Sequence, residues 1–352
     1  MKYSMNKSSK EIAGYTNWRK KLILMIIWGS FSIVIIDFIC LNFGVVSIHP
    51  KEILSLLWGS SHDKTNSLII WQLRFPRIIM ATLTGIALST VGGAFQGILR
   101  NPLADPYILG VSAGAALGAC LAIFLQYATG YFLTPYLPLF ALTGAMLSIY
   151  LVYMTAKVRY RLPLEGLLLS GVTVTFLFSA IITILIALSE KGLHSMVFWL
   201  MGDLSTANWN KITIVTFPVI VGCLIFFFFS LDLNALSLGE EEALHLGVNI
   251  KKLRLRIFII GSIIIASVVS FTGLIGFVGL VVPHIARLLV GPDHRVMLPT
   301  SALLGAIFLP LCDTLARTII APSEIPIGAI TALIGAPVFI HLLRRKSTKN
   351  GL

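Results

Sequence analysis

The chain has 352 residues, of which 57% are hydrophobic and only 12% are charged, and its formal net charge is +12. Soluble domains carry about a quarter charged residues, so a water-soluble fold of this length would lack polar surface. The composition therefore indicates an integral membrane protein. The basic residues stand in short clusters between apolar runs, a pattern that orients membrane proteins and does not indicate nucleic-acid binding.

Several long stretches contain no Asp, Glu, Lys or Arg and can cross a bilayer, which takes roughly 20 apolar residues. They are apolar on every face, so we expect helices and not barrel strands. The stretch 106–156 is long enough for two spans and breaks near Gly130. The apolar run after Lys21 lacks a small-residue cleavage site and is interpreted as the first span.

The number of spans depends on whether the stretch 257–286 turns near Ser270–Gly273. With a turn, ten spans keep most of the 27 Lys and Arg residues on the inside, so the positive-inside rule favours ten. The sequence thus predicts an all-α, polytopic membrane protein with both termini cytoplasmic: a cytoplasmic segment 1–21, a single transmembrane domain 22–343 and a cytoplasmic tail 344–352. The expected spans are 22–41, 77–99, 107–126, 136–156, 166–188, 210–230, 254–271, 275–290, 297–312 and 327–343.

Small residues recur every fourth position along two of these spans, which predicts close helix–helix contact in a compact bundle. The first stripe comprises Ala81, Gly85, Ser89, Gly93 and Gly97, and the second comprises Gly110, Gly114, Gly118 and Ala122.

Arginines cluster where the second span begins, in the segment Arg74-Phe75-Pro76-Arg77. Proline is ordinary at a helix start, and arginines near an interface can simply snorkel. The functional alternative is an external cationic patch that binds an acidic partner, with Arg317 as its third member.

The longest inside loop contains three consecutive acids, Glu240–Glu242, followed by Gly247. Acids favour the start of a helix and glycine favours its end, so we expect a helix of about two turns. A helix this short is marginal alone in water. It therefore rests either on the bundle or on a cytoplasmic partner.

Other chemistry is not indicated. The four cysteines and seven histidines show no metal-ligand spacing, so we expect no metal site. Lysines followed by Ser or Thr lack the preceding glycine of a P-loop, so ATP hydrolysis would require another chain. We expect no catalytic residues, and the chain is not expected to be an enzyme.

Several motifs together resemble the permeases of the iron-chelate and cobalamin ABC importers, and they appear in the same order along nearly the whole chain. This resemblance implies a ten-helix permease subunit that works as a homodimer or paralogous heterodimer, with two ATPase subunits below and an external substrate-binding protein above. The motifs are 74–77 (RFPR), 97–112, 276–287, 293–295 (DHR), 324–328 (EIPIG) and 335–339 (GAPVF).

The resemblance also assigns expected roles to individual residues. Arg74, Arg77 and Arg317 would dock acidic residues of the binding protein. A coupling loop at about 231–252 would place a helix on the ATPase. The residues expected to couple are Glu240, Glu241, Ala243, His245, Leu246 and Gly247. The cytoplasmic gate would lie near Asn101, Leu103, Leu164 and Glu165, although Glu165 is a charged residue where a smaller polar one is expected.

The expected function is ATP-driven import of a ferric siderophore across a bacterial cell membrane. The chain would bind no cofactor, and ATP and Mg would sit on the partner ATPase. The alternatives are a similar permease for haem or cobalamin, an ion-gradient-driven secondary transporter, and a membrane anchoring or signalling subunit. Asp37 is the only acid that we expect well inside a span, and alone it is a poor candidate for an ion site.

Overall fold

The computed structural model describes residues 2–46, 48–58, 64–157 and 163–350, with the side chains of 2–17, 57, 164 and 342–350 left out of the description. The described residues form helices and connecting segments, which confirms the all-α prediction. Eight described helices are long and apolar enough to cross a membrane, and two shorter apolar helices accompany them. The structure is therefore compatible with ten spans.

The ten helices match the expected spans in order. They are α1 (Lys2–Asn42), α4 (Phe75–Ile98), α5 (Val111–Thr129), α6 (Leu137–Ala156), α7 (Leu164–Leu188), α9 (Trp209–Phe228), α12 (Ile250–Thr272), α13 (Val278–Val290), α14 (His294–Thr318) and α15 (Ile327–Asn350). Between them lie shorter elements: α2 (Pro50–Leu57), α3 (Lys64–Leu68), the π-helix η1 (Ile69–Arg74), the 3₁₀ turns η2 (Pro106–Leu109) and η3 (Thr134–Tyr136), α8 (Leu193–Leu200), α10 (Ser230–Leu238) and α11 (Glu240–His245).

The ambiguous apolar stretch 257–286 is divided as predicted. Helix α12 ends at Thr272, and Gly273 follows with a φ of 66°, a left-handed conformation that favours glycine. Helix α13 begins at Val278, after Phe277, which also has a positive φ of 67°. The turn therefore exists, and a side chain larger than glycine occupies one of its two left-handed positions.

Helix α4 forms the centre of the bundle and is buried along most of its length. It packs most extensively against α14 and also contacts α13, α12 and α9. A methyl group on Gly85 would overlap the backbone carbonyl of Gly305 in α14, and one on Gly92 would overlap that of Gly279 in α13. The stripe of small residues on the second span is thus a backbone-to-backbone contact, as the sequence predicts.

The stripe on the third span has the same role. Helix α5 packs closely against α6, where a methyl group on Gly114 would overlap the carbonyl of Gly144 and one on Gly118 would overlap that of Phe140. Both predicted packing stripes are therefore confirmed as contact surfaces.

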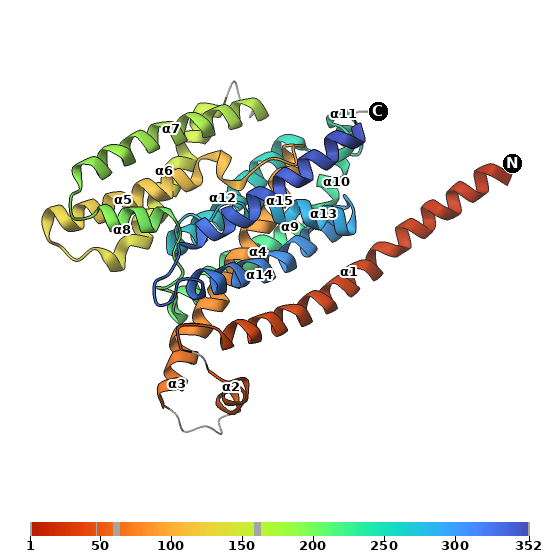
Figure 1. Ribbon diagram of the computed structural model, residues 1–352. Coiled ribbons are helices and arrows are strands. Elements are labelled where there is room, and N and C mark those ends of the chain that lie inside the picture. The colour runs from red at the N-terminus through yellow and green to blue at the C-terminus, as the bar shows by residue number, and fades with distance from the viewer. Residues whose placement is uncertain (1, 47, 59–63, 158–162, 351–352) are drawn as a thin grey trace.

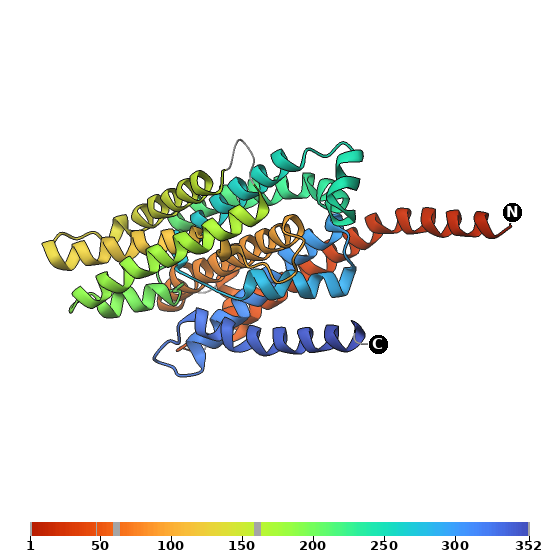
Figure 2. The same cartoon turned by 90° about the horizontal axis from the view of Figure 1, so that it is seen from above.

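The two ends of the bundle carry different elements (Figures 1 and 2). Helix α11 and the ends of α1 and α15 that carry the chain termini lie toward one end, and the turn that joins α5 to α6 lies at the other. The short helices α2 and α3 project from the bundle beside the start of α4. The coupling loop and the chain termini therefore share one end of the molecule.

Candidate functional sites

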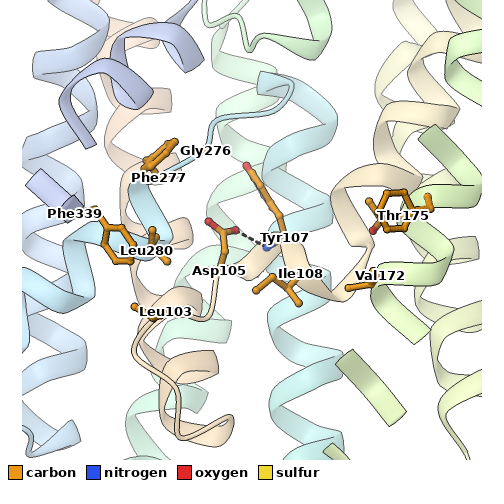
Figure 3. A pocket seen from close by; sticks show the side chains of 11 residues that line it. Leu103, Asp105, Tyr107, Ile108, Val172, Thr175, Gly276, Phe277, Leu280 and Phe339 are labelled. Carbon is orange, nitrogen blue, oxygen red and sulfur yellow. Dashed lines mark hydrogen bonds between the residues drawn. The ribbon is translucent and has the colours of Figure 1, made fainter. Parts of the chain in front are cut away.

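A pocket of about 540 Å³ opens between the segment that joins α4 to α5 and four other parts of the bundle, namely α7, the α12–α13 turn, α13 and α15. Figure 3 shows Asp105 and Tyr107 near its middle, with Phe277, Leu280 and Phe339 on one side and Val172 on the other. Most of the lining side chains are apolar. The lining residues are Leu103, Asp105, Tyr107, Ile108, Val172, Thr175, Phe176, Gly276, Phe277, Leu280 and Phe339.

Tyr107 connects two of the segments that surround this pocket. Its hydroxyl donates to the carbonyl of Ile275 over 2.9 Å and accepts from the backbone N–H of the same residue over 3.1 Å. Asp105 accepts a 2.8 Å hydrogen bond from the backbone N–H of Tyr107 and so caps the 3₁₀ turn η2. The segment after α4 is thereby tied to the α12–α13 turn.

Asp105 is the acidic group of the lining. Burial raises the pKa of its carboxyl, and the hydrogen bond from Tyr107 opposes that shift. A wall that is largely apolar with a few placed polar groups is typical of ligand pockets, and it differs from the ring of charges that lines an ion filter.

The predicted gate residues are distributed unevenly around this pocket. Leu103 lines it. Asn101 is exposed, and its side-chain oxygen accepts from the backbone N–H of Leu103 over 2.9 Å, so it shapes the turn that presents Leu103. Glu165 is exposed in the first turn of α7 and is not part of the lining, and the side chain of Leu164 lies outside the described part of the structure.

Most residues of the pocket were not found from the sequence. Val172 lies within an apolar helix, where it looks like an ordinary core or lipid-facing residue. Phe277 and Phe339 fall in the motifs 276–287 and 335–339, which carry the family resemblance. Those motifs were the available sequence signal, but they did not indicate that the two residues line one pocket.

The coupling loop folds as the predicted short helix. Helix α11 has Glu240, Glu241 and Glu242 in its first turn and ends in a Schellman motif. The N–H of Gly247 donates to the carbonyl of Leu244 over 2.9 Å, and the N–H of Val248 donates to that of Ala243 over 2.9 Å. Gly247 has a φ of 83°, so glycine is required there by the backbone and not by crowding.

This helix has one buried side and one open side. Ala243 is fully buried, and α11 contacts α10 and α12. Leu244 and Leu246 are 59% and 64% exposed, and His245 and Glu241 are exposed as well. The loop therefore rests on the bundle through Ala243 and also presents leucines that the described residues leave exposed.

The position of α11 is fixed from the following helix. Arg254 in α12 forms an ion pair and a hydrogen bond with Glu240. A cavity of about 670 Å³ lies beside them, lined by residues of α11, the 247–251 segment and Pro163. Glu240 thus has an internal partner, and the exposed leucines are held on a defined frame.

The three predicted docking arginines do lie close together, but they form a buried network and not an exposed patch. Arg77 binds Asp313 of α14 through its Nε at 3.0 and 2.9 Å and its Nη2 at 2.9 Å, and it reaches Glu324 over 2.9 Å. Arg317 lies 3.8 Å from Asp313. Asp313 lies within α14 because that helix extends to Thr318, so Asp37 is not alone as an acid inside a span.

Arg74 and Arg317 are each only 5% exposed. Arg74 donates to the carbonyl of Leu41 over 2.7 Å and to that of Val46, and Arg317 donates to the carbonyl of Cys40 over 2.7 Å. The last carbonyls of a helix lack partners within the helix, and cations favour that end. Two of the arginines thus cap the C-terminal end of α1, and their role in docking a partner stays a prediction.

Comparisons with known proteins agree with this architecture. The family model described as the FecCD transport family matches residues 16–345. The chain is 36% identical to the iron(3+)-hydroxamate import system permease protein FhuG of Bacillus subtilis, over 94% of this chain and 99% of that protein. It is 41% identical to the cobalamin import system permease protein BtuC of Halobacterium salinarum, over 81% of this chain and 76% of that protein.

A solved structure shows the same fold. It is described as an inward-facing conformation of a metal-chelate type ABC transporter, and it matches with a TM-score of 0.79 and 38% identity over 91% of this chain and 98% of that one.

Proposed function

The chain belongs to the FecCD transport family, and from that premise we propose that it carries a ferric siderophore from an external binding protein into the cytoplasm. The family consists of ABC transporter permease subunits, which are transport components of the cell membrane and not enzymes. This membership sets aside the ion-gradient-driven transporter. It also implies an ATPase and a substrate-binding protein as partners.

The observation that carries the proposed mechanism is the open side of α11. Leu244 and Leu246 are exposed on a helix whose frame is fixed by Ala243, Arg254 and the Schellman turn. Exposed apolar side chains on a rigid element are typical of a protein-binding surface. We assign this surface to the ATPase, so that closure of the ATPase dimer moves α11 and the bundle with it.

The route for the chelate is assigned to the pocket of Figure 3. A siderophore complex is bulky, and a largely apolar pocket with a few polar groups suits it better than a narrow dehydrating filter. Leu103 and Phe277 come from segments that Tyr107 ties together, so a movement of one segment is transmitted to the other. In this proposal, two permease subunits face each other across the route and alternate its access.

Docking of the binding protein is assigned to the end of the bundle where Arg77 meets Glu324. Glu324 is 39% exposed in its ion pair with Arg77, whereas Asp313 is 1% exposed. An incoming carboxylate would therefore displace Glu324 and leave the Asp313 pair intact. Arg74 and Arg317 would support this position from within by holding the end of α1.

The proposal also includes the orientation of the chain in the membrane. The end with α11 and the two termini is assigned to the cytoplasm because most of the basic loops belong there by the positive-inside rule. The permease chain itself is proposed to bind no cofactor, and ATP and Mg belong to the ATPase.

Cargo is tested by uptake in cells that lack this chain. Labelled ferric hydroxamate, ferric catecholate, haem and cobalamin would be supplied in parallel, with and without the wild-type chain. Loss and restoration of one ferric siderophore class supports the proposal. Loss of cobalamin uptake alone would favour the second candidate, to which the similarity to the Halobacterium salinarum permease points.

A further inference from the structure

A third, smaller pocket has a lining of its own. It occupies about 330 Å³ between the end of α4, the start of the following connection, α10, the end of α13 and the start of α14. It shares no lining residue with the pocket of Figure 3 and includes no residue of α11. The lining residues are Gln96, Gly97, Arg100, Pro102, Ser237, Arg287, Pro292 and His294.

The charge of this lining is positive. Arg100 and Arg287 line the pocket, and its lining contains neither Asp nor Glu. Among the described residues, no carboxylate forms an ion pair with either arginine. Arg287 has a 3.5 Å contact with the side-chain oxygen of Gln96, at the outer limit of a hydrogen bond. Two arginines therefore line the cavity, and few of their donors are bonded to other described residues.

The imidazole ring of His294 adds a buried polar atom beside this pocket. His294 is only 4% exposed, and among the described residues its Nε2 has no hydrogen-bond partner. A methyl group on Gly97 would lie 2.7 Å from this nitrogen, so the glycine keeps the space in front of it open. Buried polar atoms normally have partners, and an orphaned one beside a cavity indicates a missing ligand.

The hydrogen-bond chain behind the ring defines what this nitrogen can do. The side-chain N–H of Asn234 donates to Asp293 over 2.7 Å, so the amide oxygen of Asn234 is the acceptor. That oxygen accepts from the backbone N–H of His294 over 2.8 Å and lies 2.8 Å from its Nδ1. The hydrogen of the neutral ring is therefore on Nδ1, and Nε2 offers a lone pair to the pocket.

We propose that this pocket binds a phosphate group that carries or adjoins a hydroxyl. The phosphate oxygens accept from Arg100 and Arg287, whose planar donors match an oxyanion. The hydroxyl donates to Nε2 of His294. Inorganic phosphate and the glycerol headgroup of an anionic phospholipid both have this chemistry, and basic pockets between membrane helices bind lipid headgroups of this kind. The proposal does not depend on the identity of the cargo.

The test uses the full-length chain purified in detergent and calorimetric titration. Inorganic phosphate is titrated in one arm, and short-chain phosphatidylglycerol and phosphatidylcholine are titrated in two others. The variants are R100Q and R287Q. The matched control is R256Q, because Arg256 is an exposed arginine at the start of α12 and does not line the pocket. Monodisperse elution confirms that each variant is folded.

We expect R100Q and R287Q each to weaken binding about tenfold or more and R256Q to leave it unchanged. Binding of phosphatidylglycerol but not phosphatidylcholine identifies the headgroup as the ligand, and binding of inorganic phosphate alone identifies the free ion. The proposal is wrong if wild type binds none of the probes or if R256Q weakens binding equally. It is also wrong if R100Q and R287Q bind the probes as tightly as wild type does.

Discussion

Arg77 in α4 and Asp313 in α14 form a buried ion pair that contains three hydrogen bonds. The Nε of Arg77 lies 3.0 and 2.9 Å from the two carboxylate oxygens, and its Nη2 lies 2.9 Å from Oδ1. The pair links the start of the central helix to the last turns of the helix that it contacts most. A pair in this position supports the fold directly, whatever part it has in docking.

Removing one partner of this pair is expected to destabilise the protein. Arg77→Ala leaves the Asp313 carboxylate buried without its main cation, and such a change costs about 3–5 kcal/mol. Thermal unfolding in detergent would show a large drop in Tm relative to wild type. Arg256→Ala, at an exposed position, is the control and should change the Tm little.

The double variant Arg77→Leu with Asp313→Leu distinguishes the effect of an unpaired buried charge on stability from the effect of lost packing. Because no unpaired charge remains, it should recover much of the stability lost in the single variant. If Arg77→Ala instead kept wild-type stability and lost only affinity for the binding protein, the pair would have a docking role and no structural one.

The contact between Gly85 and Gly305 predicts a strict size limit. A methyl group on Gly85 would overlap the carbonyl oxygen and carbon of Gly305, and both helix backbones would have to move apart. We expect Gly85→Ala to destabilise by about 1–3 kcal/mol, as overpacked cores do. Gly276→Ala is the matched control, since a methyl group there meets nothing within 4 Å. Equal Tm values for the two variants would contradict the close helix contact.

The open side of α11 predicts a loss of coupling without a loss of folding. Leu244→Asp with Leu246→Asp replaces two exposed leucines by charges, so the folded chain should keep its Tm. Association with the ATPase, measured by co-purification, should fall strongly, and uptake should fall with it. Ala243→Asp is the contrast because Ala243 is buried, and this variant should lose stability. Normal uptake in the double leucine variant would rule out this surface.

The spans could be predicted because most of them are long runs with few or no charges, and the length of such a run is a local feature of the sequence. The turn within 257–286 was found from loop charge. The short elements α2, α3, α8 and α10 were missed because each is too brief to produce a distinct hydrophobic period.

The functional sites were harder to predict for a different reason. Arg74 and Arg317 were correctly placed together, but their partners are the carbonyls of Leu41, Val46 and Cys40, and a backbone acceptor leaves no mark in the sequence. The small-residue stripes and the α11 turn could be predicted because they are local patterns. The pocket of Figure 3 could not, because its walls come from five separated segments.

Asp293 predicts a pH dependence of stability in the connection before α14. Partial burial alone would raise the pKa of this carboxyl, but hydrogen bonds from Arg295 and Asn234 hold it below its ordinary value. A depressed pKa contributes stability above the unfolded value, near pH 4, and that stability is lost as the pH falls through the folded value. The Tm difference between wild type and Asp293→Asn should therefore be largest near neutral pH and shrink in acid. A constant difference would show that the charge is not involved.

The backbone of Phe277 gives the last prediction. Its φ of 67° is a left-handed conformation that costs an ordinary residue about 1–2 kcal/mol, whereas glycine adopts it freely. Phe277→Ala and Phe277→Gly both remove the ring from the pocket, so they lose nearly the same packing, but only the glycine variant also relieves the strain. We expect Phe277→Gly to be more stable than Phe277→Ala by about 1 kcal/mol, which reverses the usual order of these two residues. Thermal unfolding of the two variants side by side measures this. If alanine is the more stable of the two, residue 277 does not hold a left-handed conformation in the folded protein, and the wall of the pocket that it forms has a different shape.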